Sequence, residues 1–219
     1  MTYKCLVLDH DDTVVHSTPV IHYPSFVEAL KTLRPEKDPI TLKEFVTYCF
    51  NPGFSALCSD VMGFDKTEQA VQYRIWRDYA ESRIPGFFIG FPELITKYRD
   101  QGGLICVVSH SESKQILRDY RKHCHLEPDM IFGWDLEKDQ RKPNPYPLEE
   151  IMRTYHLKPE ELLVVDDLKP GLDMARSCGV DFAGAGWSHI IPEIADYMQT
   201  HSDYYFSTVD EFSEFLFSP

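Results

Sequence analysis

Three carboxylates follow a short apolar run near the start of the chain. Residues 5–8 are apolar, and Asp9, Asp11 and Asp12 come directly after them. Carboxylates a few ångströms apart raise each other's pKa, so such a group is stable only with a cation beside it. Oxygen ligands of this kind are what Mg²⁺ prefers in proteins. The pattern therefore predicts a magnesium site in which Asp9 and Asp11 take part.

Two later apolar runs also end in polar residues. Residues 104–108 are followed by Ser109, and residues 162–165 are followed by Asp166 and Asp167. Open α/β sheets bind ligands beyond the carboxyl ends of their strands, where these side chains would lie. Ser109 alone is equally well explained as a residue that caps the next helix, whereas an acidic pair that serves only as a cap is rarer after four apolar residues.

The elements that must position these residues alternate from residue 104 onward. Short apolar, strand-like runs are separated by stretches with helical spacing. This alternation is typical of βαβ units and predicts an α/β fold with a parallel sheet. The strands are expected at residues 5–8, 104–108, 130–132, 162–165, 181–185 and 204–206.

The segment between the first two strands has a different character. It shows helical spacing without strand-like alternation. Thr18 is predicted to cap its first helix, residues 41–44 form a capping-box pattern, and residues 65–83 form the longest helix. A break at residues 84–86 ends the segment. We therefore predict an all-helical domain of residues 18–84, inserted into a core domain of residues 1–17 and 85–219.

Composition and charge exclude several classes of partner. The 219 residues are 43% hydrophobic and carry a net charge of −13, which argues against nucleic acid and membrane surfaces, because both attract basic proteins. No apolar run reaches about 18 residues, so no membrane-spanning helix is expected. The six cysteines form no CxxC pair and are predicted to be reduced thiols, as in a cytoplasmic protein.

The motif Asp9-x-Asp11-x-Thr13 after an apolar strand resembles the first motif of the haloacid dehalogenase (HAD) superfamily, whose members are mostly phosphatases. The resemblance implies that Asp9 is a nucleophile that forms an aspartyl phosphate. It also implies that Asp11 is the general acid and base. The implied fold is a Rossmann-like HAD core with a helical cap inserted after the first motif.

The later motifs resemble the same superfamily in the same order along the chain. Ser109 matches the second motif and implies a hydrogen bond to a phosphoryl oxygen. Lys142, in a Lys-Pro-x-Pro sequence, matches the third and implies a positive charge beside the phosphoryl group. The acidic pair resembles the phosphoglycolate phosphatase and β-phosphoglucomutase branch. It implies that Asp167 binds Mg²⁺ directly, together with Asp9 and the Asp11 carbonyl, and that Asp166 supports the metal through water.

The resemblance implies a magnesium-dependent phosphatase that hydrolyses a small phosphorylated metabolite and whose cap selects the substrate. A phosphotransferase or sugar phosphate mutase with the same aspartyl phosphate is an alternative, although His22 is out of register for it. A non-catalytic HAD-like binding domain is a second alternative. A true dehalogenase is disfavoured, since that chemistry has no use for Asp11. The motifs specify neither the substrate nor the oligomeric state.

Several residues depart from the family pattern. Asp12 stands where Gly is common, His10 where an apolar residue is usual, and His110 where Asn is common. Either His is expected to contact substrate or to be a neutral, hydrogen-bonded side chain at a strand end; His110 is the one we assign to substrate binding. Residues 187–189 are expected to line the mouth of the site or to pack.

Overall fold

The computed structural model describes residues 2–218, and the chain divides into two compact units. The core unit comprises Met1–His16 and Gly86–Pro219, and the helical unit comprises Ser17–Pro85. Each junction lies one residue from the predicted boundary. The two units are described separately below.

The core unit contains a six-stranded, fully parallel sheet in the order β3-β2-β1-β4-β5-β6. The α/β class and the parallel sheet predicted from the sequence are confirmed. Each strand begins and ends within one residue of the expected range. The strands are β1 (Cys5–Leu8), β2 (Leu104–Val108), β3 (Met130–Phe132), β4 (Leu162–Asp166), β5 (Asp181–Ala185) and β6 (Tyr204–Phe206).

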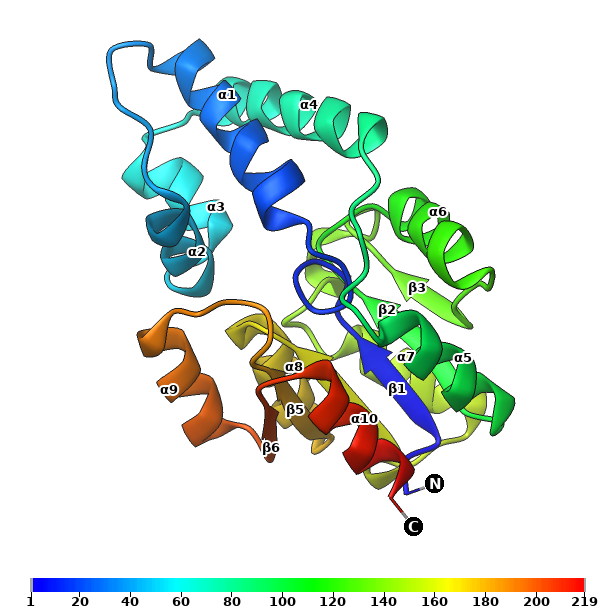
Figure 1. The fold of residues 1–219 in the computed structure, drawn as a ribbon. Helices are drawn as coiled ribbons and strands as arrows, with labels where there is room; N and C mark the ends of the chain where they lie inside the picture. Colours follow the sequence, from blue (N-terminus) through cyan, green and yellow to red (C-terminus); the bar gives the residue numbers. More distant parts are fainter. Residues whose placement is uncertain (1, 219) are drawn as a thin grey trace. The chain divides into compact units, whose positions relative to one another are not determined.

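The strands are apolar throughout because both faces of the sheet are covered. Helices α5, α6 and α10 cover one face, and α7 and α8 cover the other (Figure 1). On β1, Leu6 and Leu8 belong to the core cluster on the first face, while Val7 points to the second. The helices of the core unit are α5 (Phe91–Asp100), α6 (Ser113–Cys124), α7 (Tyr146–Tyr155), α8 (Lys169–Cys178), α9 (Pro192–His201) and α10 (Val209–Phe217), with short 3₁₀ turns at Lys138–Gln140 and Pro159–Glu161.

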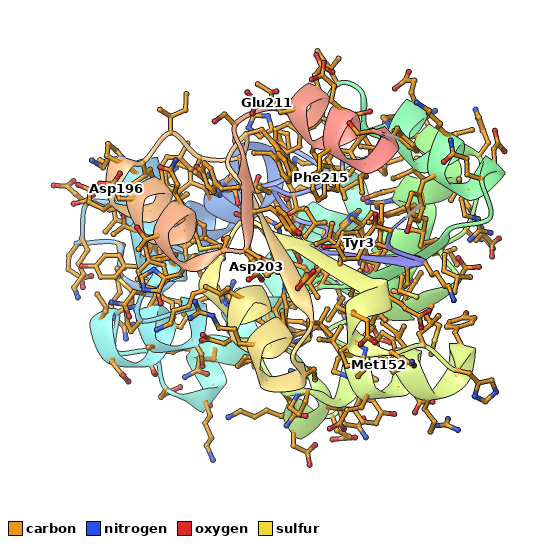
Figure 2. All side chains as sticks on the ribbon, turned by 90° about the horizontal axis from the view of Figure 1, so that it is seen from below. Tyr3, Met152, Asp196, Asp203, Glu211 and Phe215 are labelled. Carbon is orange, nitrogen blue, oxygen red and sulfur yellow. The ribbon has the colours of Figure 1, made fainter. Side chains whose placement is uncertain are left out.

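Aromatic residues close the core at the edge where β1 begins. Figure 2 shows Tyr3 and Phe215 side by side at this edge, and their ring centroids are 6.4 Å apart. The Tyr3 hydroxyl donates to Asp181 at 2.6 Å, and the Tyr98 hydroxyl donates to the Tyr3 carbonyl at 2.9 Å. These contacts fix the start of β1, and therefore the register in which its carboxyl end reaches the opposite edge of the sheet.

The helical unit is built from helices alone, as predicted. Its longest helix begins with a capping box in which Asp65 and Glu68 exchange side-chain and backbone bonds, and Thr41 and Glu44 form a second one. The prediction for Thr18 is wrong: Ser17 is the cap residue and makes no side-chain cap bond. A π-helical turn begins at Thr18 and runs directly into the next helix, so Thr18 is the first helical residue and not the residue before it. The elements are η1 (Thr18–His22), α1 (Tyr23–Leu33), α2 (Leu42–Phe50), α3 (Phe54–Ala56), η2 (Leu57–Val61) and α4 (Lys66–Ser82).

The interior of the helical unit is aromatic. Phe26 lies 5.1 Å from Phe45 between ring centroids, and Trp76 stacks on His22 while its Nε1–H donates to His22 Nδ1 at 3.0 Å. Arg34 joins the two long helices through an ion pair with Glu68 at 2.5 Å. Among residues 2–218, no helix is long and apolar enough to cross a membrane.

Candidate active site

The candidate site lies where the strand order reverses. The chain runs from β1 outward to β2 and β3, and then returns to the other side of β1 to continue through β4, β5 and β6. In open α/β sheets this reversal opens a crevice at the carboxyl ends of the two central strands. Asp9 directly follows β1, Asp166 ends β4 and Asp167 comes next. The fold therefore brings together the acidic residues of two distant motifs.

The three carboxylates form one buried cluster. Asp9, Asp166 and Asp167 each place an oxygen within 4.8 Å of the other two, and all three are buried. The Lys142 ammonium donates to Asp9 Oδ1 at 2.5 Å and to Asp166 Oδ2 at 2.7 Å. These four groups, three carboxylates and one ammonium, carry two negative charges in excess when all are ionised.

The cluster shifts the protonation equilibria of its members. Burial, with smaller contributions from neighbouring carboxylates, raises the pKa of Asp9 to about 6 and that of Asp166 to about 7, although Lys142 opposes both shifts. Burial also raises the pKa of Asp167. Burial alone would lower the pKa of Lys142, but Asp166 and Asp9 outweigh it and the pKa rises. Each acid thus resists ionisation until a further positive charge is present.

The position of Asp166 depends on the first turn of α8. Its Oδ1 accepts the Leu168 N–H at 2.8 Å. A Cβ at Gly171 would lie only 2.3 Å from Asp166 Oδ2, so only glycine leaves room for this carboxylate. The Gly in the fourth motif is therefore a steric requirement of the acidic pair that precedes it.

Asp167 is held by three neighbours on the other side of the cluster. Thr13 Oγ1 donates to Oδ1 at 3.1 Å, and Ser188 Oγ donates to Oδ2 at 3.3 Å. His189 Nε2 lies 3.1 Å from the same Oδ2 and 3.6 Å from Asp12 Oδ2. The Asp167 and Asp12 carboxylates outweigh burial and raise the pKa of His189. Of the three residues 187–189, Ser188 and His189 therefore contact the site.

Trp187 packs instead of lining the site. It stacks against Phe212, and its Nε1–H donates to the Thr13 carbonyl at 2.9 Å. Asp12 is buried with φ 58, a left-handed conformation that Gly adopts freely and that Asp tolerates better than most residues. The requirement for left-handed backbone explains why Gly is suited to this position.

Asp11 lies apart from the three-carboxylate cluster. Its Oδ2 accepts the Ser111 hydroxyl at 2.6 Å and the Ser109 hydroxyl at 3.2 Å. The structure therefore brings Ser109 to Asp11 and brings Lys142 to Asp9 and Asp166. The side chain of Asp11 is not part of the carboxylate group that could hold a metal; the predicted ligand was its backbone carbonyl.

The two histidines that depart from the family pattern point in different directions. His10 is buried and directs Nε2 at Asp119 Oδ2 on α6, 3.2 Å away, so it does not reach the carboxylate cluster. His110 keeps an exposed side, and its Nε2–H donates to the Lys142 carbonyl at 2.9 Å. Partial desolvation and then the Lys142 charge lower the pKa of His110, which is therefore neutral at pH 7.

The donor set fits Mg²⁺. Magnesium takes oxygen ligands, and one or two carboxylates with several waters are typical of its sites. The cluster offers three carboxylates with two negative charges in excess, which a divalent cation would balance. The residues that would hold the ion are Asp9 and Asp167, with Asp166 behind them beside Lys142.

Sequence reasoning did not assign a role to Ser111, and it left Ser188 and His189 open. A signal for Ser111 was present in the sequence. Ser109 and Ser111 are separated by one residue, as Asp9 and Asp11 are, and they follow the strand that pairs with β1. No comparable signal exists for His189, since its contact with Asp167 depends on the path of the loop after β5.

Comparison with known proteins agrees with this geometry. Residues 6–185, most of the chain, match the sequence model of the haloacid dehalogenase-like hydrolase family. The chain belongs to this family of hydrolases. No curated protein matches it.

Solved structures share the fold over nearly the whole chain at low sequence identity. A predicted phosphoglycolate phosphatase from Haemophilus somnus 129PT is 21% identical, with a TM-score of 0.77 and coverage of 99% of this chain and 97% of that one. A Bacteroides fragilis protein, provisionally named a haloacid dehalogenase-like hydrolase, is 22% identical, with a TM-score of 0.80 and coverage of 96% and 99%. CbbY from Rhodobacter sphaeroides, solved in complex with phosphate, is 16% identical, with a TM-score of 0.67 and coverage of 94% of each chain.

Proposed function

We propose that the chain is a magnesium-dependent phosphatase that hydrolyses a small organic phosphate monoester through an aspartyl-phosphate intermediate. The observation that carries the proposal is the buried cluster of Asp9, Asp166, Asp167 and Lys142, with two negative charges in excess. Membership of the hydrolase family and the phosphatase names of similar structures support the same reaction.

In this proposal Asp9 is the nucleophile. It lies at the end of a rigid central strand, and its backbone N–H donates to the Val165 carbonyl at 2.8 Å, which fixes the carboxylate relative to β4. The neighbouring Lys142 ammonium provides positive charge for a phosphoryl oxygen, and the Ser109 hydroxyl provides a hydrogen bond. A covalent intermediate divides one difficult hydrolysis into two easier displacements.

Asp11 is the proposed general acid and base. It protonates the leaving oxygen while Asp9 attacks phosphorus, and it later removes a proton from the water that hydrolyses the intermediate. It is suited to this role because the Ser109 and Ser111 hydroxyls both donate to its carboxylate and hold it in place. Bound Mg²⁺ would neutralise negative charge on the phosphoryl group and orient it.

The test is turnover of a panel of small phosphate esters with and without Mg²⁺, measured as released phosphate. Asp167→Ala is expected to raise the Mg²⁺ concentration needed for half-maximal rate by roughly tenfold to a hundredfold, because it removes a proposed metal ligand. Asp196→Ala is the matched control, since Asp196 is an exposed carboxylate on α9 outside the cluster (Figure 2). Full activity after exhaustive chelation would contradict the metal assignment, and an isomerised product without phosphate release would indicate a mutase.

A further inference from the structure

Two serine hydroxyls contact the proposed general acid, and Ser111 makes the shorter contact. Its Oγ lies 2.6 Å from Asp11 Oδ2, whereas Ser109 Oγ lies 3.2 Å from the same oxygen. Ser111 is buried and lies in the turn between β2 and α6. A hydroxyl at this distance from a carboxylate makes a strong, charge-assisted hydrogen bond.

Two hydrogen bonds hold the backbone of Ser111. Its N–H donates to Ser109 Oγ at 3.1 Å, and its carbonyl accepts the Trp134 N–H at 2.8 Å. The loop after β3 can come this close only because residue 133 is glycine: a Cβ there would lie 2.7 Å from the Ser111 carbonyl oxygen. The hydroxyl is therefore presented to Asp11 from a fixed position, without the freedom of an exposed serine.

We propose that Ser111 is a positioning residue for the reaction, acting through Asp11. Its hydroxyl occupies Oδ2 and so directs the catalytic proton to Oδ1, the oxygen that does not accept the two serine hydroxyls. This inference rests on the proposed phosphatase function and deepens it. It assigns to Ser111 a role separate from the phosphoryl contact proposed for Ser109.

The two serines have separate roles because each hydroxyl has a single proton to donate. When Ser109 donates that proton to a phosphoryl oxygen, its bond to Asp11 is lost. Ser111 is then the remaining hydroxyl donor to Oδ2. Without Ser111, the carboxyl group would lose this short hydrogen bond during the step that needs it. A misplaced catalytic group slows a reaction sharply.

The proton balance of the two half-reactions is simple. In the first, an Asp9 oxygen bonds to phosphorus, the bond to the ester oxygen breaks, and the Oδ1 proton of Asp11 passes to that oxygen. In the second, water bonds to phosphorus, the Asp9–phosphorus bond breaks, and one water proton returns to Asp11. Ser111 keeps its own proton throughout and donates it to Oδ2 in both steps.

Ser111→Ala tests the role through the dependence of rate on the leaving group. With an alkyl phosphate, whose leaving oxygen needs a proton, kcat is expected to fall about tenfold to a hundredfold while KM stays within about twofold. With p-nitrophenyl phosphate the first burst of product is expected to keep its rate, because this leaving group needs little help, while the steady rate falls. A loss of folding or of general integrity would slow the burst as well.

Two variants complete the test. Ser113→Ala is the matched control, because Ser113 lies in the same segment and donates to the Asp135 carboxylate at 2.8 Å, away from Asp11; it is expected to leave both substrates unaffected. Ser111→Thr retains the hydroxyl and is expected to recover most of the rate with the alkyl phosphate. Equal loss with both substrates in the burst, or an undiminished rate in Ser111→Ala, would overturn the proposal.

A crystallographic comparison separates this proposal from the proposed function. If the wild type hydrolyses no ester of the panel with Mg²⁺ present, the proposed function is wrong. Turnover measurements then cannot test the role of Ser111. Structures of the wild type and of Ser111→Ala, both grown with Mg²⁺, still decide the positioning role. The Asp11 carboxylate is expected to rotate or become disordered in the variant, and an unchanged Asp11 would refute the role of Ser111.

Discussion

Asp9 and His10 are neighbours at the end of β1, and their side chains enter two buried polar regions of opposite character. Asp9 enters the carboxylate cluster with Asp166 and Lys142. His10 points to α6, where its Nε2 lies 3.2 Å from Asp119 Oδ2. Both regions place ionisable groups out of solvent, so burial alone does not distinguish them.

Charge balance distinguishes the two regions. Asp119 accepts from His10 on one oxygen and from the Arg118 Nε–H, at 2.7 Å, on the other, so its charge is compensated. In the Asp9 region three carboxylates share one ammonium, and of these three carboxylates His189 contacts Asp167. A balanced buried group is stable alone, whereas an excess of one sign is costly unless a ligand supplies the opposite charge. The His10 region is therefore structural, and the Asp9 region is the place where a ligand is expected.

The largest expected effect on turnover comes from a substitution in the Asp9 region. Asp9→Asn keeps the shape of the side chain but removes the attacking oxygen and its charge. Turnover of every phosphate ester is expected to fall by at least about 10⁴-fold, as for loss of other enzymatic nucleophiles. Circular dichroism and the unfolding midpoint are expected to stay near those of the wild type. A variant that retains the wild-type rate would remove Asp9 from the mechanism and end the contrast with His10.

Asp11→Asn is expected to have the next largest effect. Asn cannot give or take a proton, and general acid–base groups typically contribute about 10²–10⁴-fold. With p-nitrophenyl phosphate the phosphoenzyme is expected to accumulate, giving a burst followed by slow turnover. Rapid-quench measurement of bound phosphate checks this. Wild-type steady rates on both activated and ordinary esters would show that Asp11 has another role.

In the His10 region, a substitution is expected to change the free energy of unfolding and not the rate of the reaction. Asp119→Ala leaves His10 Nε2 buried without this partner, which is expected to cost about 3 kcal/mol of unfolding free energy. Asp119→Asn, which retains an acceptor oxygen, is expected to cost less. Urea unfolding measures the difference, and titration with Mg²⁺ is expected to give the same affinity for all three proteins. A strong change in Mg²⁺ affinity would show that the two regions are not separate.

The same contrast explains what could be predicted from the sequence. The strands were readable because β1 and β4 are buried on both faces and therefore apolar throughout. Asp9, Asp166 and Asp167 were found because each follows such a run, and the strand order then brings them together. Local signals of this kind need no knowledge of distant contacts.

Long-range contacts could not be predicted in the same way. The direction of His10 depends on Asp119, which lies 109 residues later in the chain. The contact of His189 with Asp167 depends on a loop after β5, and that of Ser111 with Asp11 depends on the approach of Gly133. Thr18 was assigned as the cap in place of Ser17 because the local sequence does not show which of two adjacent hydroxyl residues precedes the first helical turn.

The smallest expected effect concerns pH and tests the excess charge directly. Burial raises the pKa of Asp9 to about 6 and that of Asp166 to about 7. Between about pH 4 and 7 the folded, metal-free protein therefore holds protons that the unfolded chain has released, so its stability falls as the pH rises. Each group contributes on the order of 1 kcal/mol per pH unit within its own window.

The difference between the wild type and Asp166→Asn isolates this effect, because His110, whose pKa is lowered, titrates in both and in the opposite direction. We expect the wild type to lose stability relative to Asp166→Asn as the pH rises from about 5 to 7, in urea unfolding without metal. Added Mg²⁺, which binds only the ionised carboxylates, is expected to stabilise the wild type increasingly over the same interval. If the wild type instead gains stability relative to the variant as the pH rises, the cluster carries no excess charge, and the distinction between the two sides of β1 is lost.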